Sequence, residues 1–160
     1  MEAQTNHQSS NSAQAYPVGQ YTQPPISLLQ IDSHLRNTDF TVQCSGLAKI
    51  PKLLNSNPNP DLINSVYLKL AEYFRKDSST NYLRTVIIRV IKETAPANLH
   101  QMLNYQDIEF INRVSFVMNS NDPTKRTLTI RLLGICAIIS VNKTNVKHYR
   151  GVLLKCRILG

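Results

Sequence analysis

From Ile26 onward, large hydrophobic residues recur at the three- and four-residue spacing of helices that bury one face. This spacing predicts helices over Ile26–Leu35 and Phe40–Leu54, the second of them kinked at Pro51. The clearest pattern follows Asp61, which can cap a helix whose apolar face carries Ile63, Val66, Tyr67, Leu70 and Phe74. The pattern therefore predicts an all-α fold.

After the polar break at residues 77–80, the stripe over Tyr82–Lys92 is rich in β-branched residues and also admits a strand. We favour a helix, because the spacing is 3.6 and not 2. A short element around Leu99–Leu103 is expected next. Asp107–Met118 is then apolar nearly all round, as is typical of a helix packed between neighbours. Asn145–Leu159 is amphipathic but irregular.

The sharpest predicted boundary lies at Asp122-Pro123. Asp122 can accept hydrogen bonds from the free amides of a helix start, and proline prefers the first helical position. A helix should begin there and run to about Val141. Gly134 lies in its middle, where glycine costs about 1 kcal/mol relative to alanine, so we interpret it as a point of close approach by another helix.

About eight short helices leave two architectures open, a compact bundle or stacked helical pairs of the HEAT or armadillo kind. The sequence contains no convincing self-alignment at the repeat length of such proteins. The apolar periodicity alone does not choose between the two.

The formal charge of +8 is unevenly placed, since residues 84–160 hold twelve basic and four acidic side chains while residues 1–83 hold six of each. No run of lysine or arginine is long enough for a nucleic-acid-binding arm. The start of the chain does not look like a secretory leader, and no stretch approaches about 18 apolar residues, so we expect neither secretion nor membrane insertion. The three cysteines, Cys44, Cys136 and Cys156, are read as reduced thiols, mostly buried.

No constellation of residues indicates catalysis. The four histidines are scattered along the chain: His7, His34, His100 and His148. The sequence contains no metal-binding helix motif, no nucleophile elbow and no phosphate-binding loop. Of the candidate carboxylates Asp32, Asp107, Glu109 and Asp122, the last is accounted for as a helix cap, and Asp32 falls on a different predicted element from Asp107 and Glu109. We expect no enzyme, no catalytic residue, no cofactor and no metal. Tyr67, Tyr73 and Tyr82 lie on or beside apolar stripes and are expected in the core or at its rim.

Five stretches of the sequence are recognisable: the long strings Asp61–Arg75 and Val117–Gly134, and the short ones Asn81–Arg84, Gln43-Cys44 and Ile50–Leu53. Together they resemble the family of subunit seven of the nuclear Integrator complex. The likeness covers about residues 27–142. Family members are several times longer, so the chain looks like a truncated form, a variant or a fragment.

The resemblance implies a non-catalytic α-solenoid of HEAT or armadillo type, within a nuclear assembly that processes small nuclear RNA ends and attenuates RNA polymerase II transcription. It implies other Integrator subunits as partners. We accordingly divide the sequence into a disordered Gln/Ser/Asn-rich tail (1–24), a helical-repeat domain (25–144) and a divergent helical segment (145–160).

Lys125, Arg126 and Arg131 are the candidate partner-binding residues. Lys125 and Arg126 lie in the first turn of the predicted helix, where positive charge opposes the helix dipole. They could present a basic ridge to an acidic partner. Alternatively, solvent or a carboxylate from the adjacent repeat compensates them, and this is favoured for Arg131, expected nearer the buried stripe. A nucleic-acid-binding helical module and an adaptin- or coatomer-like trafficking trunk remain as rival functions.

Overall fold

The computed structural model describes residues 26–104 and 109–141, with side chains at 26–98 and 109–139. Within these ranges all regular structure is helical, which confirms the predicted all-α class. The elements are α1 (Leu28–Arg36), α2 (Phe40–Ala48), α3 (Ile50–Ser56), α4 (Pro60–Arg75), α5 (Asn81–Asn104), α6 (Glu109–Ser115), the 3₁₀ turn η1 (Phe116–Asn119) and α7 (Pro123–Val141).

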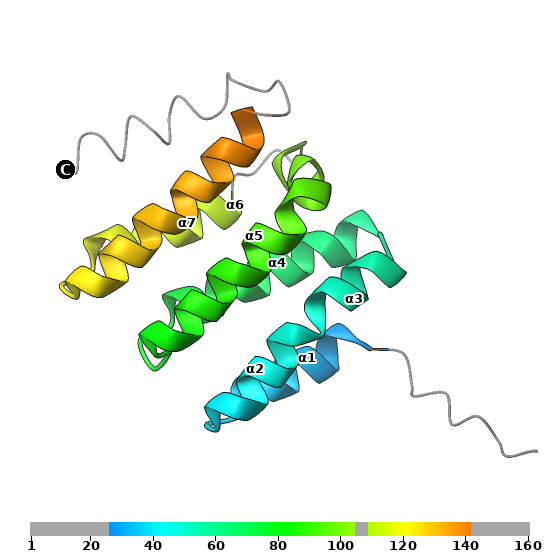
Figure 1. The fold of residues 1–160 in the computed structure, drawn as a ribbon, viewed down its shortest axis with the longest axis horizontal. Coiled ribbons are helices and arrows are strands. Elements are labelled where there is room, and N and C mark those ends of the chain that lie inside the picture. Colours follow the sequence, from blue (N-terminus) through cyan, green and yellow to red (C-terminus); the bar gives the residue numbers. More distant parts are fainter. Residues whose placement is uncertain (1–25, 105–108, 142–160) are drawn as a thin grey trace, which may run out of the picture.

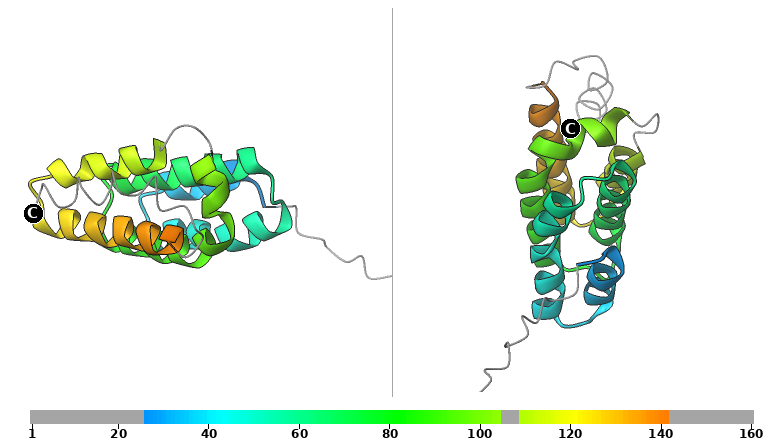
Figure 2. Two further views of the ribbon diagram at one scale, coloured as in Figure 1. Left: turned by 90° about the horizontal axis from the view of Figure 1, so that it is seen from above. Right: turned by 90° about the vertical axis from the view of Figure 1, so that its right-hand side faces the viewer.

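The helices form two layers (Figures 1 and 2). One layer contains α1, α4 and α6, and the other contains α2, α3, α5 and α7. Helices adjacent in the sequence pack across the layers as the pairs α1 with α2, α4 with α5, and α6 with α7, while α4 and α5 also contact the pairs on either side. The middle pair therefore holds the described part of the chain together.

The core lies between the two layers and is centred on α4. All five residues predicted for its apolar face are at most 1% exposed (Ile63, Val66, Tyr67, Leu70 and Phe74). The Tyr67 ring meets Phe110 of α6 edge-on at 6.0 Å. Its hydroxyl lies 2.7 Å from Oγ1 of Thr94 on α5, and burial raises the pKa of Tyr67 to about 12. Tyr67 thus joins three helices.

The start of α4 differs from the prediction. Asn59, not Asp61, is the N-cap, because its side chain accepts a hydrogen bond from the Asp61 amide at 2.8 Å while Pro60 occupies the first helical position. The predicted kink near Pro51 is present as a break at Lys49, between α2 and α3. Proline is tolerated in the first turn of α3, where its missing N–H has no intrahelical acceptor.

The predicted break between Lys92 and Leu99 is wrong, because α5 continues through Pro96. Pro96 lies on an exposed face, whereas the buried stripe continues beneath it through Ile91 and Ala95. The packing of this stripe outweighs the intrinsic helix-breaking tendency of proline. Conversely, α6 ends at Ser115, and Phe116 is 66% exposed, so the expectation of a helix packed on all sides fails there.

The close approach predicted at Gly134 lies at another glycine. A Cβ at Gly134 would meet no atom within 4 Å, so the predicted close approach is wrong. Gly46 of α2 is the tight contact, since a Cβ there would lie 2.6 Å from Cβ of His34 on α1. Glycine at this point allows α1 and α2 to pack closely.

Several predictions lie outside the described residues: the proposed tail (1–24), the segment Asn145–Leu159, Cys156 and Asp107. For the segment predicted over Leu99–Leu103, the structure describes the backbone but not the side chains. In the described ranges, no helix combines the length and apolar character needed to cross a membrane.

Candidate functional site

The residues of the recognisable sequence strings meet where α4 turns into α5. Arg84 of α5 is only 3% exposed and donates three hydrogen bonds: from Nε to the Phe74 carbonyl at 2.9 Å, from Nη2 to the Lys76 carbonyl at 2.8 Å, and from Nη1 to Oδ1 of Asn81 at 2.9 Å. These carbonyls belong to the end of α4, where intrahelical donors are lacking. Burial lowers the pKa of Arg84. Arg84 therefore ties the end of α4 to the start of α5.

Asn81 extends this network to the next helix pair. Its Nδ2 donates to Oδ2 of Asp122 at 3.2 Å, and Oδ1 of Asp122 accepts from the amides of Thr124 at 2.8 Å and Lys125 at 3.2 Å. Asp122 is thus the N-cap predicted for α7. The hydrogen bonds from Asn81 and from the Lys125 amide lower the pKa of the Asp122 carboxyl.

Lys125 closes the network from the other side. Lys125 is only 7% exposed, and its Nζ lies 2.7 Å from Oδ1 of Asp77 in the loop between α4 and α5. The hydrogen bond and charge of Lys125 lower the pKa of Asp77, whose own side chain is fully exposed. Lys125 buries its aliphatic stem while its ammonium reaches a solvated carboxylate. The compensating carboxylate expected from an adjacent helix pair is Asp77.

The three candidate partner-binding residues do not lie in one cluster. Lys125 is paired within the chain, and Arg126 is half-buried and donates from Nη1 to the Ser120 carbonyl at 2.7 Å. Arg131 lies about 120° around the helix axis from Lys125. Its side chain is exposed, so the expectation that it lies near the buried stripe is wrong. Arg131 is the most accessible of the three to another molecule.

A second polar cluster holds α1 against α4. Asp32 is 8% exposed, and its carboxylate lies 2.6 Å from Nη2 of Arg36 and 3.3 Å from Nζ of Lys69. The Tyr73 hydroxyl donates to Oδ1 of Asp32 at 3.4 Å. Although burial raises the pKa of Asp32, the hydrogen bonds and charges of Lys69 and Arg36 lower it overall. The arrangement serves packing between helix pairs.

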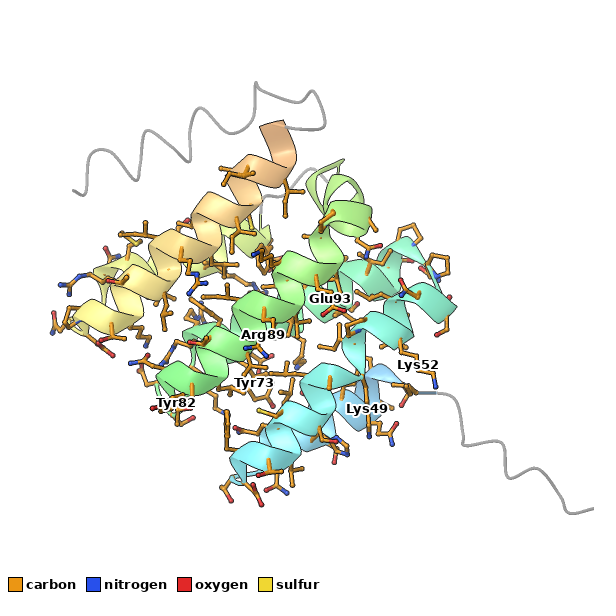
Figure 3. The ribbon with its side chains drawn as sticks, in the orientation of Figure 1. Lys49, Lys52, Tyr73, Tyr82, Arg89 and Glu93 are labelled. Atoms are coloured by element: carbon orange, nitrogen blue, oxygen red, sulfur yellow. The ribbon has the colours of Figure 1, made fainter. Side chains whose placement is uncertain are left out.

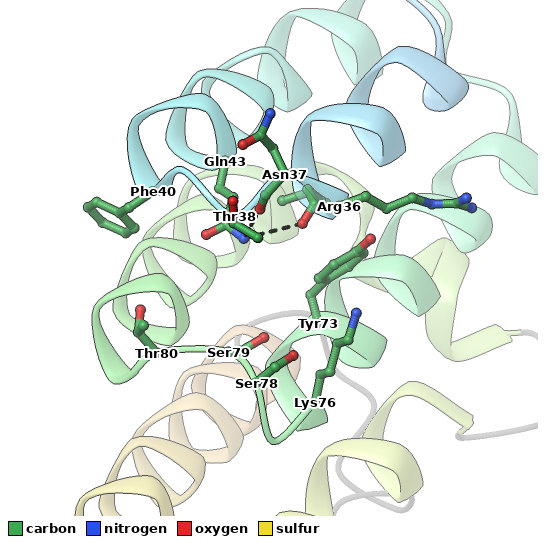
Figure 4. A pocket seen from close by; sticks show the side chains of 11 residues that line it. Arg36, Asn37, Thr38, Phe40, Gln43, Tyr73, Lys76, Ser78, Ser79 and Thr80 are labelled. Atoms are coloured by element: carbon green, nitrogen blue, oxygen red, sulfur yellow. Dashed lines mark hydrogen bonds between the residues drawn. The ribbon is translucent and has the colours of Figure 1, made fainter.

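A pocket of about 360 Å³ opens between the α1–α2 loop and the α4–α5 loop (Figure 4). Gln43 shapes its wall by donating from Nε2 to the carbonyls of Leu35 at 3.3 Å and Asn37 at 2.7 Å. The residues that line it include three hydroxyl-bearing residues in succession, Ser78, Ser79 and Thr80, but no histidine, cysteine or carboxylate that could activate them. The ionisable side chains that do line it are Arg36, Tyr73 and Lys76.

The remaining reactive side chains are dispersed. Cys136 is fully buried, and burial raises the pKa of its thiol to about 12, which suppresses the reactive thiolate. Cys44 is half-buried, and burial also raises its pKa. Tyr67 and Tyr73 lie in the core as predicted, whereas Tyr82 is 79% exposed. In the described ranges, no three histidine, cysteine or acidic side chains are grouped as a metal site would require.

The sequence predicted only part of this hydrogen-bond network. Asp122 was recognisable as a cap from Asp-Pro alone, but Asn81, Arg84 and Asp77 carried no interpretable chemistry of their own. The signal was present in the string Asn81–Arg84, because an arginine three residues after an asparagine at a helix start can bond back to it. The acceptors that Arg84 finds on α4 depend on the turn of the chain.

Comparison with known proteins gives one consistent result. Residues 28–151 match the family model described as Integrator complex subunit 7, N-terminal. Over 122 residues the chain is 37% identical to Integrator complex subunit 7 of Gallus gallus and 36% identical to that of Homo sapiens. It is 28% identical over 121 residues to the Integrator complex subunit 7 homolog of Dictyostelium discoideum. Each match covers 76% of this chain and 11 or 12% of the relative.

Proposed function

Because the chain belongs to the Integrator complex subunit 7 family, we propose that it acts as a non-catalytic scaffold, contributing protein contacts to the nuclear Integrator complex. In this role it supports small nuclear RNA 3′-end processing and attenuation of transcription by RNA polymerase II without carrying out either reaction. Its helix pairs form the start of an α-solenoid of the HEAT or armadillo kind.

The observation that carries the proposal is the network between the middle and last helix pairs. Residues from two separate family-like strings meet in it, Asn81 and Arg84 from one and Asp122 and Lys125 from the other. The hydrogen bonds of this network join α4, α5 and α7. Residues of two strings that resemble the family thus support the stacking of helix pairs, which leaves long outer surfaces for partner proteins.

The test is affinity purification of the tagged chain from nuclear extract, with the recovered proteins identified by mass spectrometry. We expect other Integrator subunits to be enriched over an untagged control. The matched variant is Arg84→Met, which removes the network's central donor and should reduce that recovery along with thermal stability. Enrichment of cytosolic coat proteins, or of no Integrator subunit, would refute the proposal.

A further inference from the structure

The two helical layers carry different charge. The described side chains of α1, α4 and α6 include four carboxylates and four cations, Asp32, Asp61, Glu72, Glu109, Arg36, Lys69, Arg75 and Arg113. Four ion pairs link members of this set. That layer is electrically balanced by its own residues.

The opposite layer is not balanced. Among the described side chains of α2, α3, α5 and α7 and of the linking Lys49, the one carboxylate is Glu93, whereas six cations are exposed or half-buried (Lys49, Lys52, Arg89, Lys92, Arg126 and Arg131). The ion pairs found among the described residues involve none of the first four of these cations. Within the described part of the chain, the charge of these four side chains is therefore not neutralised by a carboxylate.

Four of these cations lie on neighbouring elements of this layer, and we name them the basic face: Lys49 between α2 and α3, Lys52 of α3, and Arg89 and Lys92 of α5. Figure 3 labels Lys49 and Lys52 on the segment next to α5, and Arg89 and Glu93 on α5 itself. The two segments are neighbours, because α2 and α3 both contact α5. Arg89 and Lys92 are three residues apart on one helix and so are surface neighbours.

An exposed aromatic pair lies on the same layer. Tyr82 is 79% exposed and meets Phe40 of α2, which is 42% exposed, with ring centroids 6.4 Å apart at 62°. Tyr82 is seven residues before Arg89, so both side chains lie on one line of α5, as Figure 3 also shows. Exposed aromatic residues beside arginine are typical of the parts of protein interfaces that contribute most to binding.

We propose that the basic face, with Phe40 and Tyr82 as its apolar anchor, docks an acidic amphipathic segment of a partner protein. This rests on the scaffold function proposed above and adds the chemistry of one contact. A protein segment fits better than a nucleic acid, because Glu93 lies among the cations on α5, where it repels a continuous phosphate backbone. A protein segment can instead place a lysine or a hydroxyl opposite Glu93.

Zero-length carbodiimide crosslinking of the complex purified through the tagged chain tests this directly, because it joins a lysine amine to a carboxylate only where the two are in contact. We expect Lys49, Lys52 or Lys92 to be joined to aspartate or glutamate of another subunit. If the subunits co-purify but these lysines crosslink to no other subunit, the docking inference is overturned while the scaffold function stands. If no Integrator subunit co-purifies, the scaffold function itself fails.

A double charge reversal supplies a second measurement. Lys52→Glu with Arg89→Glu should reduce recovery of the crosslinked subunit roughly tenfold without lowering the melting temperature, because both side chains are exposed and like charges repel across the interface. The matched control compares two single reversals: Arg89→Glu should reduce recovery, whereas Arg75→Glu, the same charge change at the exposed end of α4, should retain it. Equal losses of recovery in the two single variants would contradict an acidic protein partner. So would ultraviolet crosslinking of Tyr82 to RNA, together with shielding of the lysines from the crosslinker that nuclease treatment removes.

Discussion

Nζ of Lys125 on α7 lies 2.7 Å from Oδ1 of Asp77, 48 residues earlier in the chain, in the loop that joins α4 to α5. The contact bridges two helix pairs beside the Asn81–Asp122 hydrogen bond. Two polar links at the same end of the stack fix how the last pair sits on the middle one.

The first prediction concerns the pH dependence of the Asp77 contact. Because the pKa of folded Asp77 is lowered from 3.8, the pair contributes stability above this value, and the contribution is lost as pH falls through the folded pKa. Asp77→Asn should therefore melt at a lower temperature than the parent chain at neutral pH, and the two should converge in acid. Circular dichroism melts at both pH values measure this. A gap that persists in acid would show that the charge of Asp77 is not its source.

The second prediction concerns Arg84. Replacing it with methionine leaves the Phe74 and Lys76 carbonyls without this donor, so the free energy of unfolding should fall by about 2 to 4 kcal/mol. Arg84→Lys should recover only part of the loss, because a single ammonium cannot reproduce the planar fork. Urea denaturation gives the values. The control Arg89→Met, exposed on the same helix, should stay within about 0.5 kcal/mol of the parent.

The third prediction contrasts two glycine-to-alanine changes. Gly46→Ala should destabilise the fold by about 1 to 3 kcal/mol, because the new methyl group meets the inflexible Cβ of His34. Gly134→Ala should stabilise it by about 0.5 to 1 kcal/mol, because the site is open and alanine loses less backbone entropy in a helix. Thermal and urea unfolding distinguish the two. Opposite signs to these would mean that α1 and α2, or α7 and a neighbour, pack differently.

The fourth prediction concerns the start of α4. Asn59→Ala removes the acceptor for the Asp61 amide and should cost about 1 kcal/mol of unfolding free energy. Asn59→Asp retains a side-chain oxygen at the cap and should behave like the parent chain within a few tenths of a kcal/mol. Equal destabilisation by both substitutions would indicate that the asparagine acts through another contact.

The features that the sequence predicted correctly are those that depend on neighbouring residues. Whether a helix forms, and where it starts, depends on residues within about four positions, so the buried face of α4 and the cap at Asp122-Pro123 were readable directly. Where two adjacent caps competed, as at Asn59 and Asp61, the same local rules still held but the proline between them selected the first.

Only the tertiary structure decided which residues meet across helices. A side chain at Gly46 would collide with His34, and α5 continues past Pro96 because its inner stripe is packed. Lys125 is paired because Asp77, in the loop between α4 and α5, lies within reach of its ammonium. Each outcome depends on contacts between segments far apart in the chain, and no local propensity encodes the free energy of that packing. The charge imbalance of the sequence was visible from the start, but among the described residues the positive excess lies on one layer because of which helices share that layer.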